Sequence, residues 1–478
     1  MNTIDIYKQE NHDYLASRRV RWDALWKNTK GKARYYNQYI NRVYCQNIPK
    51  HSKVLDLGCG TGDLLAALEP SLGVGVDLSD VAITYAKAKN PALIFYCGDI
   101  ADFDHECDEF DYIIMSDVLN EIWDVQSLFE NVKRFVGPNT RIIINNYSNL
   151  WRFPVNIARK IGISTPKLRQ NWLTPHDVNN LLGITGFEVI RSWPEILCPF
   201  RAPGANLVNR YLAKIPPFNF GAVSNFFVAR SCAVRDLKDM PSASVVIAAR
   251  NESGHIDELI RRVPKMGPND EIIFVEGNST DDTYDVIKSA IAKHPGLNIK
   301  LFKQPGKGKG DAVRKGFSEA KGDILFILDA DITVPPEDLP RFYELIASDK
   351  ADFVNGVRLV YPMEDNAMRF ANLVGNKFFS LAFSWLLGQP IRDTLCGTKV
   401  IRKLDYVALQ KNRSYFGDFD PFGDFDLLFG AAKLNLKIME VPIRYRARRY
   451  GETNIERWKH GVLLLKMVAF AARRIKFV

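Results

Sequence analysis

Short apolar runs that end in a glycine or an acidic residue recur along both halves of the chain, separated by segments of helical character. Apolar runs of about four to eight residues are typical of buried strands. The clearest one, Ile324 to Leu328, ends in Asp329-Ala330-Asp331. Alternating strands and helices predict parallel, doubly wound α/β sheets, which bind ligands at the carboxyl ends of their strands. Two acids at such an end can face one hard cation, and the alternative is a solvated acidic turn before Pro335-Pro336.

Length and composition limit the classes of protein to be considered. At 478 residues the chain is too long for one ordinary domain, and 46% hydrophobic with 25% charged residues indicates a folded globular protein. The seven cysteines stand singly, which predicts neither a zinc site nor a disulfide framework and favours a reducing cytoplasm. We expect no signal peptide and no membrane span. The net charge of +9 permits anionic partners such as nucleotides and lipid phosphates, whereas nothing specific predicts binding of nucleic acid.

The first half opens with two predicted polar helices in residues 1–50, whose aromatic residues suit helix packing, or alternatively a lid. The pattern then changes to a strand, a glycine loop at 58–62 and a helix. Glycines at alternate positions let a ligand approach the backbone closely, and the next helix offers free N–H groups. The next strand ends in Asp77, at the spacing of an acid that accepts hydrogen bonds from ribose hydroxyls. Later strands lead to Asp99 and to Ser116-Asp117.

These residues resemble the class I S-adenosylmethionine-dependent methyltransferases. The loop reads Asp56-Leu57-Gly58-Cys59-Gly60-Thr61-Gly62, unlike the Gly-x-Gly-x-x-Gly of dinucleotide enzymes. The resemblance implies a Rossmann-like sheet over residues 1–231, closed by antiparallel strands at 186–193 and 224–230, with S-adenosylmethionine as cofactor. The alternatives are a redox Rossmann domain and a degenerate scaffold. The residues implied to bind the cofactor are Asp56, Gly58, Gly60, Gly62, Asp77, Leu78, Asp99, Ile100 and Ser116.

The methyl acceptor is less well specified. Methyl transfer is governed by positioning, and an oxygen acceptor needs at most a base. Asp117, Asn120 and Glu121 are the candidates after the fourth strand, although each also suits a helix cap or a helix surface. His176 is expected in the first turn of a helix, in a structural role. The basic and aromatic tract 151–169 suits an acidic or sugar acceptor, or a solvated helical face.

The second half begins after a short polar stretch, residues 232–242, which predicts a linker. A new strand at 244–249 starts a second α/β unit, and its second strand leads to the polar loop 276–283. Residues 306–312 form a glycine- and lysine-rich loop that can reach a phosphate. This loop is not a Walker sequence, because no Ser or Thr follows the lysine at the required position. Asp329-Ala330-Asp331 then ends the fourth strand.

This order of motifs resembles the family 2 glycosyltransferases of GT-A fold, over residues 243–478. The resemblance implies a nucleotide-sugar donor and Mg2+ or Mn2+ held by Asp329 and Asp331. The family usually has Asp-Asp-Gly-Ser where this chain has residues 276–279, a departure that affects the nucleotide contacts and not the fold. The residues implied to bind the nucleotide sugar are Ala248, Ala249, Arg250, Asn251, Glu252, Glu276, Asn278, Lys309, Asp311, Asp329 and Ala330.

Beyond the metal motif the resemblance narrows to synthases of polyprenyl-phosphate mannose and glucose. Residues 393–399 resemble that branch's Asp-x-x-Cys/Ser-Gly-Phe-Lys/Arg, residues 424–426 stand at its Asp-x-Glu, and 451–453 resemble its Gly-x-Ser. A polyprenyl-phosphate acceptor is implied, with a glycan as the alternative. A phosphate acceptor needs no base, whereas a hydroxyl would use Asp424 or Asp426. The catalytic candidates are Asp393, Asp424 and Asp426 here, and Asp117 in the first half.

Two segments of the second half suit a membrane surface: the short apolar run 378–387 and the mixed apolar and basic tail 461–477. A core helix and a solvated tail are the alternatives. We therefore expect a cytoplasmic enzyme, peripheral at the inner face of the membrane. It would transfer a methyl group and a sugar in glycan, surface polysaccharide or lipid-linked sugar synthesis. The alternatives are a glycosyltransferase with a non-catalytic methyltransferase-like module, and two activities on separate soluble acceptors.

Overall fold

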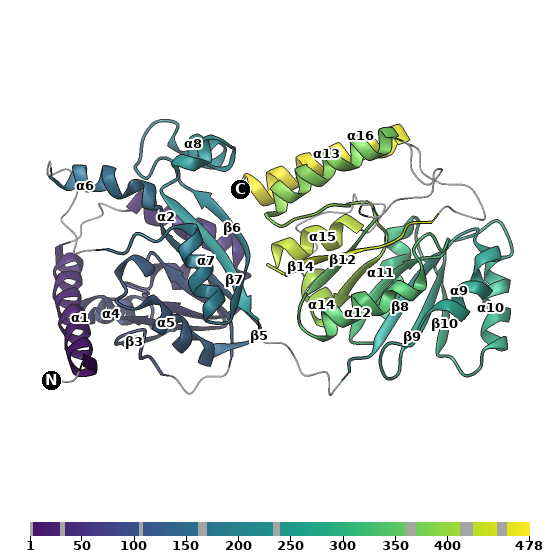
Figure 1. Ribbon diagram of the computed structural model, residues 1–478, viewed down its shortest axis with the longest axis horizontal. Coiled ribbons are helices and arrows are strands. Elements are labelled where there is room, and N and C mark those ends of the chain that lie inside the picture. The colour runs from purple at the N-terminus through teal and green to yellow at the C-terminus, as the bar shows by residue number, and fades with distance from the viewer. Residues whose placement is uncertain are drawn as a thin grey trace. The chain divides into compact units, whose positions relative to one another are not determined.

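The chain forms two α/β units (Figure 1). The computed structural model describes residues 3–28, 34–104, 109–160, 170–232, 240–358, 360, 370–411, 424–446 and 457–478. The N-terminal unit comprises residues 1–233 with 477–478, and the C-terminal unit comprises 234–476. Each unit contains a seven-stranded sheet with an apolar core on either face. The predicted fold class, two α/β sheets in succession, is confirmed.

The N-terminal sheet has the strand order β3-β2-β1-β4-β5-β7-β6. The first five strands are parallel, and β7 lies antiparallel between β5 and β6, as predicted for the closing pair. Val54, Leu55 and Leu57 of β1 are fully buried, because helices cover both faces of a parallel sheet. The strands are β1 (Lys53–Leu57), β2 (Leu72–Asp77), β3 (Ile94–Cys97), β4 (Phe110–Ser116), β5 (Val136–Tyr147), β6 (Phe187–Glu195) and β7 (Ser224–Ser231).

The helices of this unit begin with the two that the sequence predicts before the sheet. They are α1 (Thr3–Asn28), α2 (Arg34–Asn47), α3 (Asp63–Ala67), α4 (Asp80–Lys89), α5 (Val125–Val132), α6 (Arg152–Lys160), α7 (Pro175–Ile184) and α8 (Ala205–Arg210). The 3-10 turns used below are η1 (Leu119–Glu121), η3 (Asn149–Trp151), η4 (Leu212–Lys214) and η5 (Phe218–Gly221). Thr174 caps α7 in a capping box with Asp177, and His176 lies exposed in the first turn, as predicted.

The C-terminal sheet has the order β10-β9-β8-β11-β13-β12-β14. Strands β8 to β11 are parallel, whereas β13 runs antiparallel to both of its neighbours, β11 and β12. The strands are β8 (Ala243–Ala249), β9 (Glu271–Glu276), β10 (Ile299–Lys303), β11 (Ile324–Asp329), β12 (Phe353–Val357), β13 (Lys399–Arg402) and β14 (Ile438–Pro442). The helices are α9 (Ile256–Arg262), α10 (Thr283–Lys293), α11 (Lys309–Glu319), α12 (Leu339–Ala347), α13 (Phe370–Leu387), α14 (Lys403–Lys411), α15 (Asp424–Lys433) and α16 (Arg457–Ala471).

The two segments expected at a membrane form α13 and α16, which pack together. Phe383 of α13 and Met467 of α16 are fully buried in one apolar cluster, so each helix contributes one face to the core. The opposite faces expose apolar side chains, including Phe378 and Leu381 on α13 and Leu465 on α16. Among the described residues, no helix combines the length and the hydropathy that crossing a bilayer requires.

Candidate active sites

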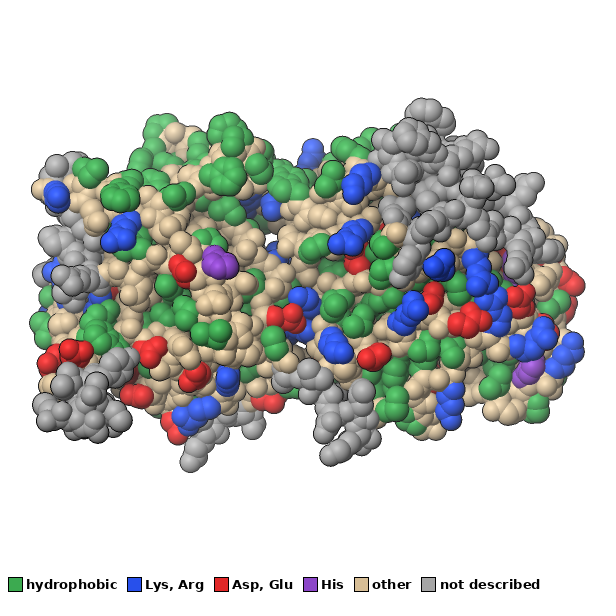
Figure 2. All heavy atoms as spheres, viewed as in Figure 1, with side chains coloured by type: hydrophobic (Ala, Val, Ile, Leu, Met, Phe, Trp, Pro, Cys, Tyr) green, Lys and Arg blue, Asp and Glu red, His purple; other side chains and the backbone are tan. Residues whose placement is uncertain are grey.

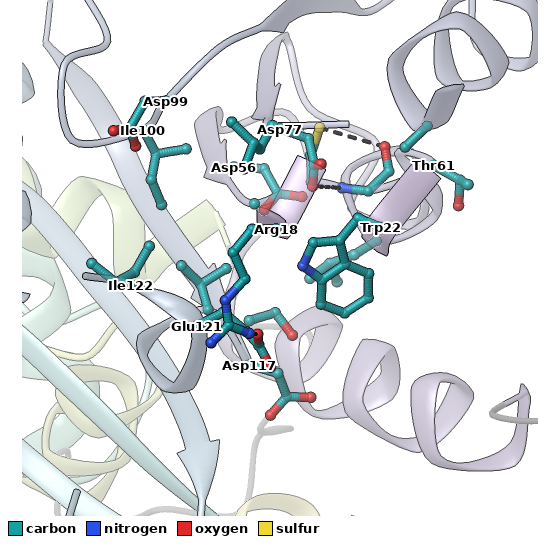
Figure 3. A pocket seen from close by; sticks show the side chains of 18 of the residues that line it. Arg18, Trp22, Asp56, Thr61, Asp77, Asp99, Ile100, Asp117, Glu121 and Ile122 are labelled. Atoms are coloured by element: carbon teal, nitrogen blue, oxygen red, sulfur yellow. Dashed lines mark hydrogen bonds and ion pairs between the residues drawn. The ribbon is translucent and has the colours of Figure 1, made fainter. Parts of the chain in front are cut away.

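A cavity of about 1390 Å³ lies at the carboxyl edge of the N-terminal sheet (Figure 3). The register pairs Leu57 with Val76 and Asp77 with Cys97, so the loops after β1, β2 and β3 start at the same level. Helices α1 and α2 contribute the facing wall. Gly62 is the one predicted cofactor residue that does not line the cavity. The predicted cofactor residues that line it are Asp56, Gly58, Gly60, Asp77, Leu78, Asp99, Ile100 and Ser116.

The loop after β1 requires glycine for both its torsion angles and its space. Gly58, Gly60 and Gly62 have φ values of 89°, 51° and 72°, in the left-handed region that side chains disfavour. A Cβ atom on Gly58 would overlap Val118 Cγ2, and one on Gly62 would lie 2.6 Å from Phe95 Cζ. Gly62 therefore serves the packing of the loop against β3, whereas Gly58 and Gly60 leave the backbone open to the cavity.

Asp77 fixes the two loops that meet at the cavity. The Gly60 N–H donates to Asp77 Oδ2 at 2.8 Å (Figure 3), and the Ser79 N–H donates to Oδ1 at 2.9 Å. Burial raises the pKa of Asp77 in spite of these two hydrogen bonds. Each oxygen keeps a further lone pair, so the carboxylate can hold the loops and still accept from ligand hydroxyls.

Asp56 is a buried group of this cavity that lacks a hydrogen-bond partner. Its side chain is 1% exposed, and neither carboxyl oxygen has a hydrogen-bond partner. Burial, followed by the neighbouring Asp77, raises the pKa of Asp56 to about 8. Buried polar groups are ordinarily hydrogen-bonded, and an unpaired one costs stability. A cationic ligand group in the cavity would remove this cost.

Helix α1 is fastened over the cavity at two points. Arg18 is 3% exposed and forms an ion pair with Glu121 of η1, while its Nη2 donates to Tyr14 Oη at 2.7 Å. One turn further on, Asp23 Oδ1 accepts from the Ser79 hydroxyl at 2.5 Å, at the start of α4. Between these points Trp22 lies along the cavity (Figure 3). The lid alternative therefore describes α1 better than a purely structural role does.

Sequence reasoning did not select Arg18 or Trp22, although a signal was available. Arg18, Trp22 and Trp26 repeat at intervals of four and line the cavity together. This spacing places the three side chains on one helix face. The aromatic residues of α2 behave as the packing interpretation predicts, since Tyr36, Tyr39 and Tyr44 lie in the core.

The three acceptor-side candidates occupy different environments. Asp117 lines the cavity, and its Oδ1 accepts from Asn145 Nδ2 at 2.7 Å and from Tyr36 Oη at 3.1 Å. Asn120 is 1% exposed and joins two backbone segments, while Glu121 is paired with Arg18. Asp117 thus lines the cavity while two donors hold one of its carboxyl oxygens.

The second candidate site lies at the carboxyl edge of the C-terminal sheet. Asp329 ends β11 opposite Ala248 of β8, and Ala249 lies opposite Glu276 of β9. Lys309, the first residue of α11, places Nζ 2.5 Å from Asp329 Oδ1. Burial by itself would raise the pKa of Asp329, but Lys309 outweighs it and the pKa lies below its usual range. The register thus brings the predicted acid, cation and loops to one edge.

The segment that connects α13 to β13 packs against this ion pair. A Cβ atom on Gly397 would overlap Asp329 Oδ2 and would lie 2.5 Å from Lys309 Nζ, so a larger residue would force these two side-chain ends to move. Asp393 is fully buried and accepts from Arg358 Nε at 2.7 Å and from Nη2 at 2.8 Å. Arg358, which no sequence motif singled out, thereby holds the segment in place.

Comparison with known proteins matches the two halves of the chain to two different families. Residues 48–176 match the family model of a methyltransferase domain, and residues 244–406 match that of glycosyl transferase family 2. The chain contains a methyltransferase domain and a family 2 glycosyltransferase domain. Both are enzyme domains, and the family resemblances read from the sequence are confirmed.

The glycosyltransferase domain accounts for the similarity to curated relatives. Dolichol-phosphate mannosyltransferase of Pyrococcus furiosus is 29% identical over 49% of this chain and 66% of its own length. Undecaprenyl-phosphate 4-deoxy-4-formamido-L-arabinose transferase of Edwardsiella ictaluri is 26% identical over 48% of this chain and 66% of its own length. The chain thus spans slightly less than two thirds of these relatives. A solved glucosyl-3-phosphoglycerate synthase of Mycobacterium tuberculosis is 19% identical over 49% of this chain and 80% of that one, with a TM-score of 0.37.

Several predicted donor-binding residues of the glycosyltransferase domain shape its loops. Asn251 Oδ1 accepts from the Thr280 N–H at 2.8 Å, and Glu276 Oε1 accepts from the Ser279 N–H at 2.5 Å. Glu252 Oε2 lies 3.0 Å from His255 Nδ1, and Asp311 Oδ2 accepts from the Gly306 N–H at 2.7 Å. Arg250 is exposed, Ala330 is buried, and Asn278 adopts a φ of 56°. These contacts hold the loop ends around Asp329.

A divalent cation fits the acids of the glycosyltransferase domain. Within the described ranges no three His, Cys, Asp or Glu side chains cluster at metal-binding distance. Asp329 and Asp331 would therefore supply two carboxylates, and the remaining oxygen ligands would come from substrate phosphates and water, as is usual for Mg2+. Lys309 already places a positive charge at Asp329, and Asp331 Oδ1 accepts from the Thr333 hydroxyl at 2.8 Å. Oxygen-only donors favour Mg2+ or Mn2+.

Parts of the predicted acceptor site lie outside the described residues. These are the Gly-x-Ser-like stretch 451–453 and the side chain of Asp424, which begins α15. Asp426 lies half-buried in the first turn of that helix. The catalytic roles of Asp424 and Asp426 stay predictions.

Replacing Gly397 with alanine is expected to lower sugar transfer at least about 100-fold, because the new methyl group would separate Asp329 from Lys309 and displace the acid. The rate of transfer from labelled nucleotide sugar measures this effect. Gly296→Ala is the matched control, since a Cβ atom there meets no neighbour within 4 Å. Equal activity of the two variants would show that the close approach of Gly397 has no role.

Proposed function

We propose that this chain is a bifunctional enzyme. Residues 1–231 transfer a methyl group from S-adenosylmethionine, and residues 243–478 transfer a sugar from a nucleotide-sugar donor, with 232–242 as linker. The proposal rests above all on the two sets of carboxylates at the carboxyl edges of the two sheets. Asp56 is unpaired in the cavity of the first sheet, and Asp329 is paired with Lys309 at the carboxyl edge of the second sheet.

The methyltransferase proposal assigns roles to the residues of the first cavity. Asp56 would receive the ammonium of the cofactor, Gly58 and Gly60 would lie against its methionine portion, and Asp77 would accept from the ribose. Asp99 and Ile100 would flank the adenine. The cofactor supplies an activated methyl group, and the protein's task is positioning. Asp117 is the proposed acceptor-side base, because it lines the same cavity and two donors fix its orientation.

The glycosyltransferase proposal uses Asp329 and Asp331 to hold Mg2+ or Mn2+, which would neutralise the diphosphate of the leaving group. Lys309 is suited to move from Asp329 to that diphosphate once a divalent cation is bound. For Asp393 we propose a positioning role instead of a catalytic one, because its carboxylate is fully buried and Arg358 binds both of its oxygens. A phosphate acceptor would attack without a base, and a hydroxyl would require Asp424 or Asp426.

We further propose a lipid-linked acceptor, a polyprenyl phosphate, and peripheral attachment at the cytoplasmic face of a membrane. The names of the two curated relatives refer to dolichol phosphate and undecaprenyl phosphate. The exposed side chains Phe378 and Leu381 of α13 and Leu465 of α16 support a surface contact. The two domains would act on one glycan in succession, in surface polysaccharide or lipid-linked sugar synthesis.

The experiment is an assay of both transfers with the purified chain. Radiolabelled nucleotide sugars are supplied with polyprenyl phosphate and Mg2+, and radiolabelled S-adenosylmethionine is supplied with the sugar product. We expect label from both donors in one product. A chain that transfers sugar and binds S-adenosylmethionine in calorimetry, but never transfers methyl, would make the first domain a binding module and refute bifunctionality.

A further inference from the structure

The methyltransferase domain exposes a concentration of large apolar side chains away from the glycine loop. Besides Tyr211, eight of the 23 exposed large hydrophobic residues in the described part of the chain lie in the two segments 149–157 and 200–220. Their exposed fractions run from 37% to 75%. They are Leu150, Phe153, Ile157, Phe200, Leu207, Leu212, Phe218 and Phe220, and together we call them the exposed apolar face. A patch of this size on a soluble domain ordinarily marks an interaction site.

The two segments form one surface, although about 45 residues separate them in the chain. Trp151 Nε1 of η3 donates to the Gly221 carbonyl of η5 at 3.0 Å, so the start of α6 lies beside η5. Turn η4 is in turn packed on both η5 and α8. Figure 1 places α6 and α8 along the same edge of the domain, and Figure 2 shows hydrophobic side chains gathered there.

The charged residues within the two segments that carry this face have one sign. Residues 148–160 and 196–223 contain six basic residues and no Asp or Glu. Arg152, Lys160 and Arg201 are exposed, whereas Lys214 is buried in an ion pair with Glu195. Apolar side chains on short turns with basic neighbours are the pattern of proteins that insert into the headgroup region of anionic bilayers.

The exposed apolar face adjoins the cavity wall through α2 and the end of β5. Tyr147 lines the cavity and stacks on Tyr36 with ring centroids 5.8 Å apart, and η3 begins two residues later. Tyr35, the neighbour of Tyr36 on α2, donates to Asn206 Oδ1 of α8 at 2.8 Å. Anything that binds to the exposed apolar face would therefore lie close to the cavity.

We propose that the exposed apolar face docks the methyltransferase domain on an anionic lipid bilayer. Phe153 and Phe220 enter the headgroup region, and Arg152, Lys160 and Arg201 meet lipid phosphates. This surface is distinct from α13 and α16 of the glycosyltransferase domain. Docking here brings the cavity to the membrane surface, where a lipid-linked methyl acceptor would be present, and that consequence rests on the proposed methyl transfer.

The test is vesicle flotation of the full chain with mixtures of phosphatidylcholine and phosphatidylglycerol. Phe153→Ser/Phe220→Ser is expected to lower the affinity for vesicles at least about tenfold, because two apolar side chains no longer leave water. The two phenylalanines are 75% and 72% exposed, so their replacement spares the fold. Measurements in a Phe378→Ser/Leu381→Ser background isolate this face from α13. Binding is expected to require phosphatidylglycerol and to weaken with salt.

The matched control is Val20→Ser/Ile184→Ser, which removes two apolar side chains that are 71% and 57% exposed elsewhere in the domain. Three results would overturn the proposal. They are an absence of vesicle binding by the unaltered chain, equal affinities of the two double variants, and loss of self-association without any change in vesicle affinity. The last result would assign the face to a protein contact. Calorimetry on the same variants measures the binding of S-adenosylmethionine, and it thus tests the proposed methyltransferase function separately from vesicle binding.

Discussion

Replacing Asp331 with asparagine is expected to lower sugar transfer about 1000-fold and to leave methyl transfer unchanged. In the proposed function Asp331 and Asp329 hold a divalent cation, and this cation would carry the charge that develops on the departing diphosphate. Lys309 is already paired with Asp329, so the loss of Asp331 leaves a single shared carboxylate for the metal. A site with one acid and one competing ammonium binds Mg2+ or Mn2+ weakly.

The measurement follows both transfers in one preparation, together with Mn2+ binding by calorimetry in the presence of the nucleotide product. Glu344→Gln is the control, because it removes one carboxylate charge from a side chain that is 65% exposed on α12. If the Asp331→Asn protein transferred sugar at the rate of the control, the proposed metal site at this strand end would be wrong. A parallel fall in methyl transfer would instead indicate that the substitution damages the whole chain.

Replacing Asp56 with asparagine is expected to weaken S-adenosylmethionine binding about 100-fold, because a charge-assisted hydrogen bond to the cofactor is lost. In the unaltered protein the pKa of Asp56 is raised to about 8, so the group is mostly protonated in the empty cavity near neutral pH. The cofactor's ammonium favours the ionised form, and binding then releases a proton. Affinity should rise about tenfold between about pH 6 and about pH 7, and the asparagine variant should lose this dependence.

Calorimetry at the two pH values, in buffers of different ionisation enthalpy, measures both the affinity and the released proton. Because the folded pKa of Asp56 lies above its unfolded value, ionisation destabilises the empty domain as pH rises toward 8. The Asp56→Asn protein should consequently melt no lower than the unaltered one near neutral pH, which separates lost binding from lost folding. Glu130→Gln, an exposed acid of α5, is the control. A pH-independent affinity of the unaltered protein would refute the role of Asp56.

The sequence predicted the strand ends well because their signals are local. The runs before Asp77 and Asp329 are apolar throughout, the run before Gly58 is apolar except for Asp56, and each becomes a buried parallel strand. The glycines of the first loop are also explained locally, because their φ values lie in the region that other residues disfavour. The expectation that His176 lies in the first turn of a helix was correct for a similar local reason, because Thr174 caps that helix.

Local signals did not place the residues that act through distant partners. Arg358 stands 35 positions before Asp393, and only the antiparallel strand β13 between β11 and β12 brings the two side chains together. Gly397 looked like one member of a motif, but its closeness to Asp329 and Lys309 depends on the same strand order. Arg18 and Trp22 belong to a polar helix whose position over the cavity is set by contacts with Ser79 and Glu121.

The sequence by itself therefore determined the two α/β domains, the glycine loop and the acids at the strand ends, because apolar periods, torsional demands and strand polarity act within a few residues. The tertiary structure decided which of these groups are charged, paired or open. Asp56 has no hydrogen-bond partner and lies in a cavity that α1 and α2 help to enclose, and the pKa of Asp329 is lowered mainly because α11 brings Lys309 to it, with smaller effects of Lys399 and Arg358. Electrostatic state depends on neighbours that are remote in the chain, and no local pattern of residues encodes them.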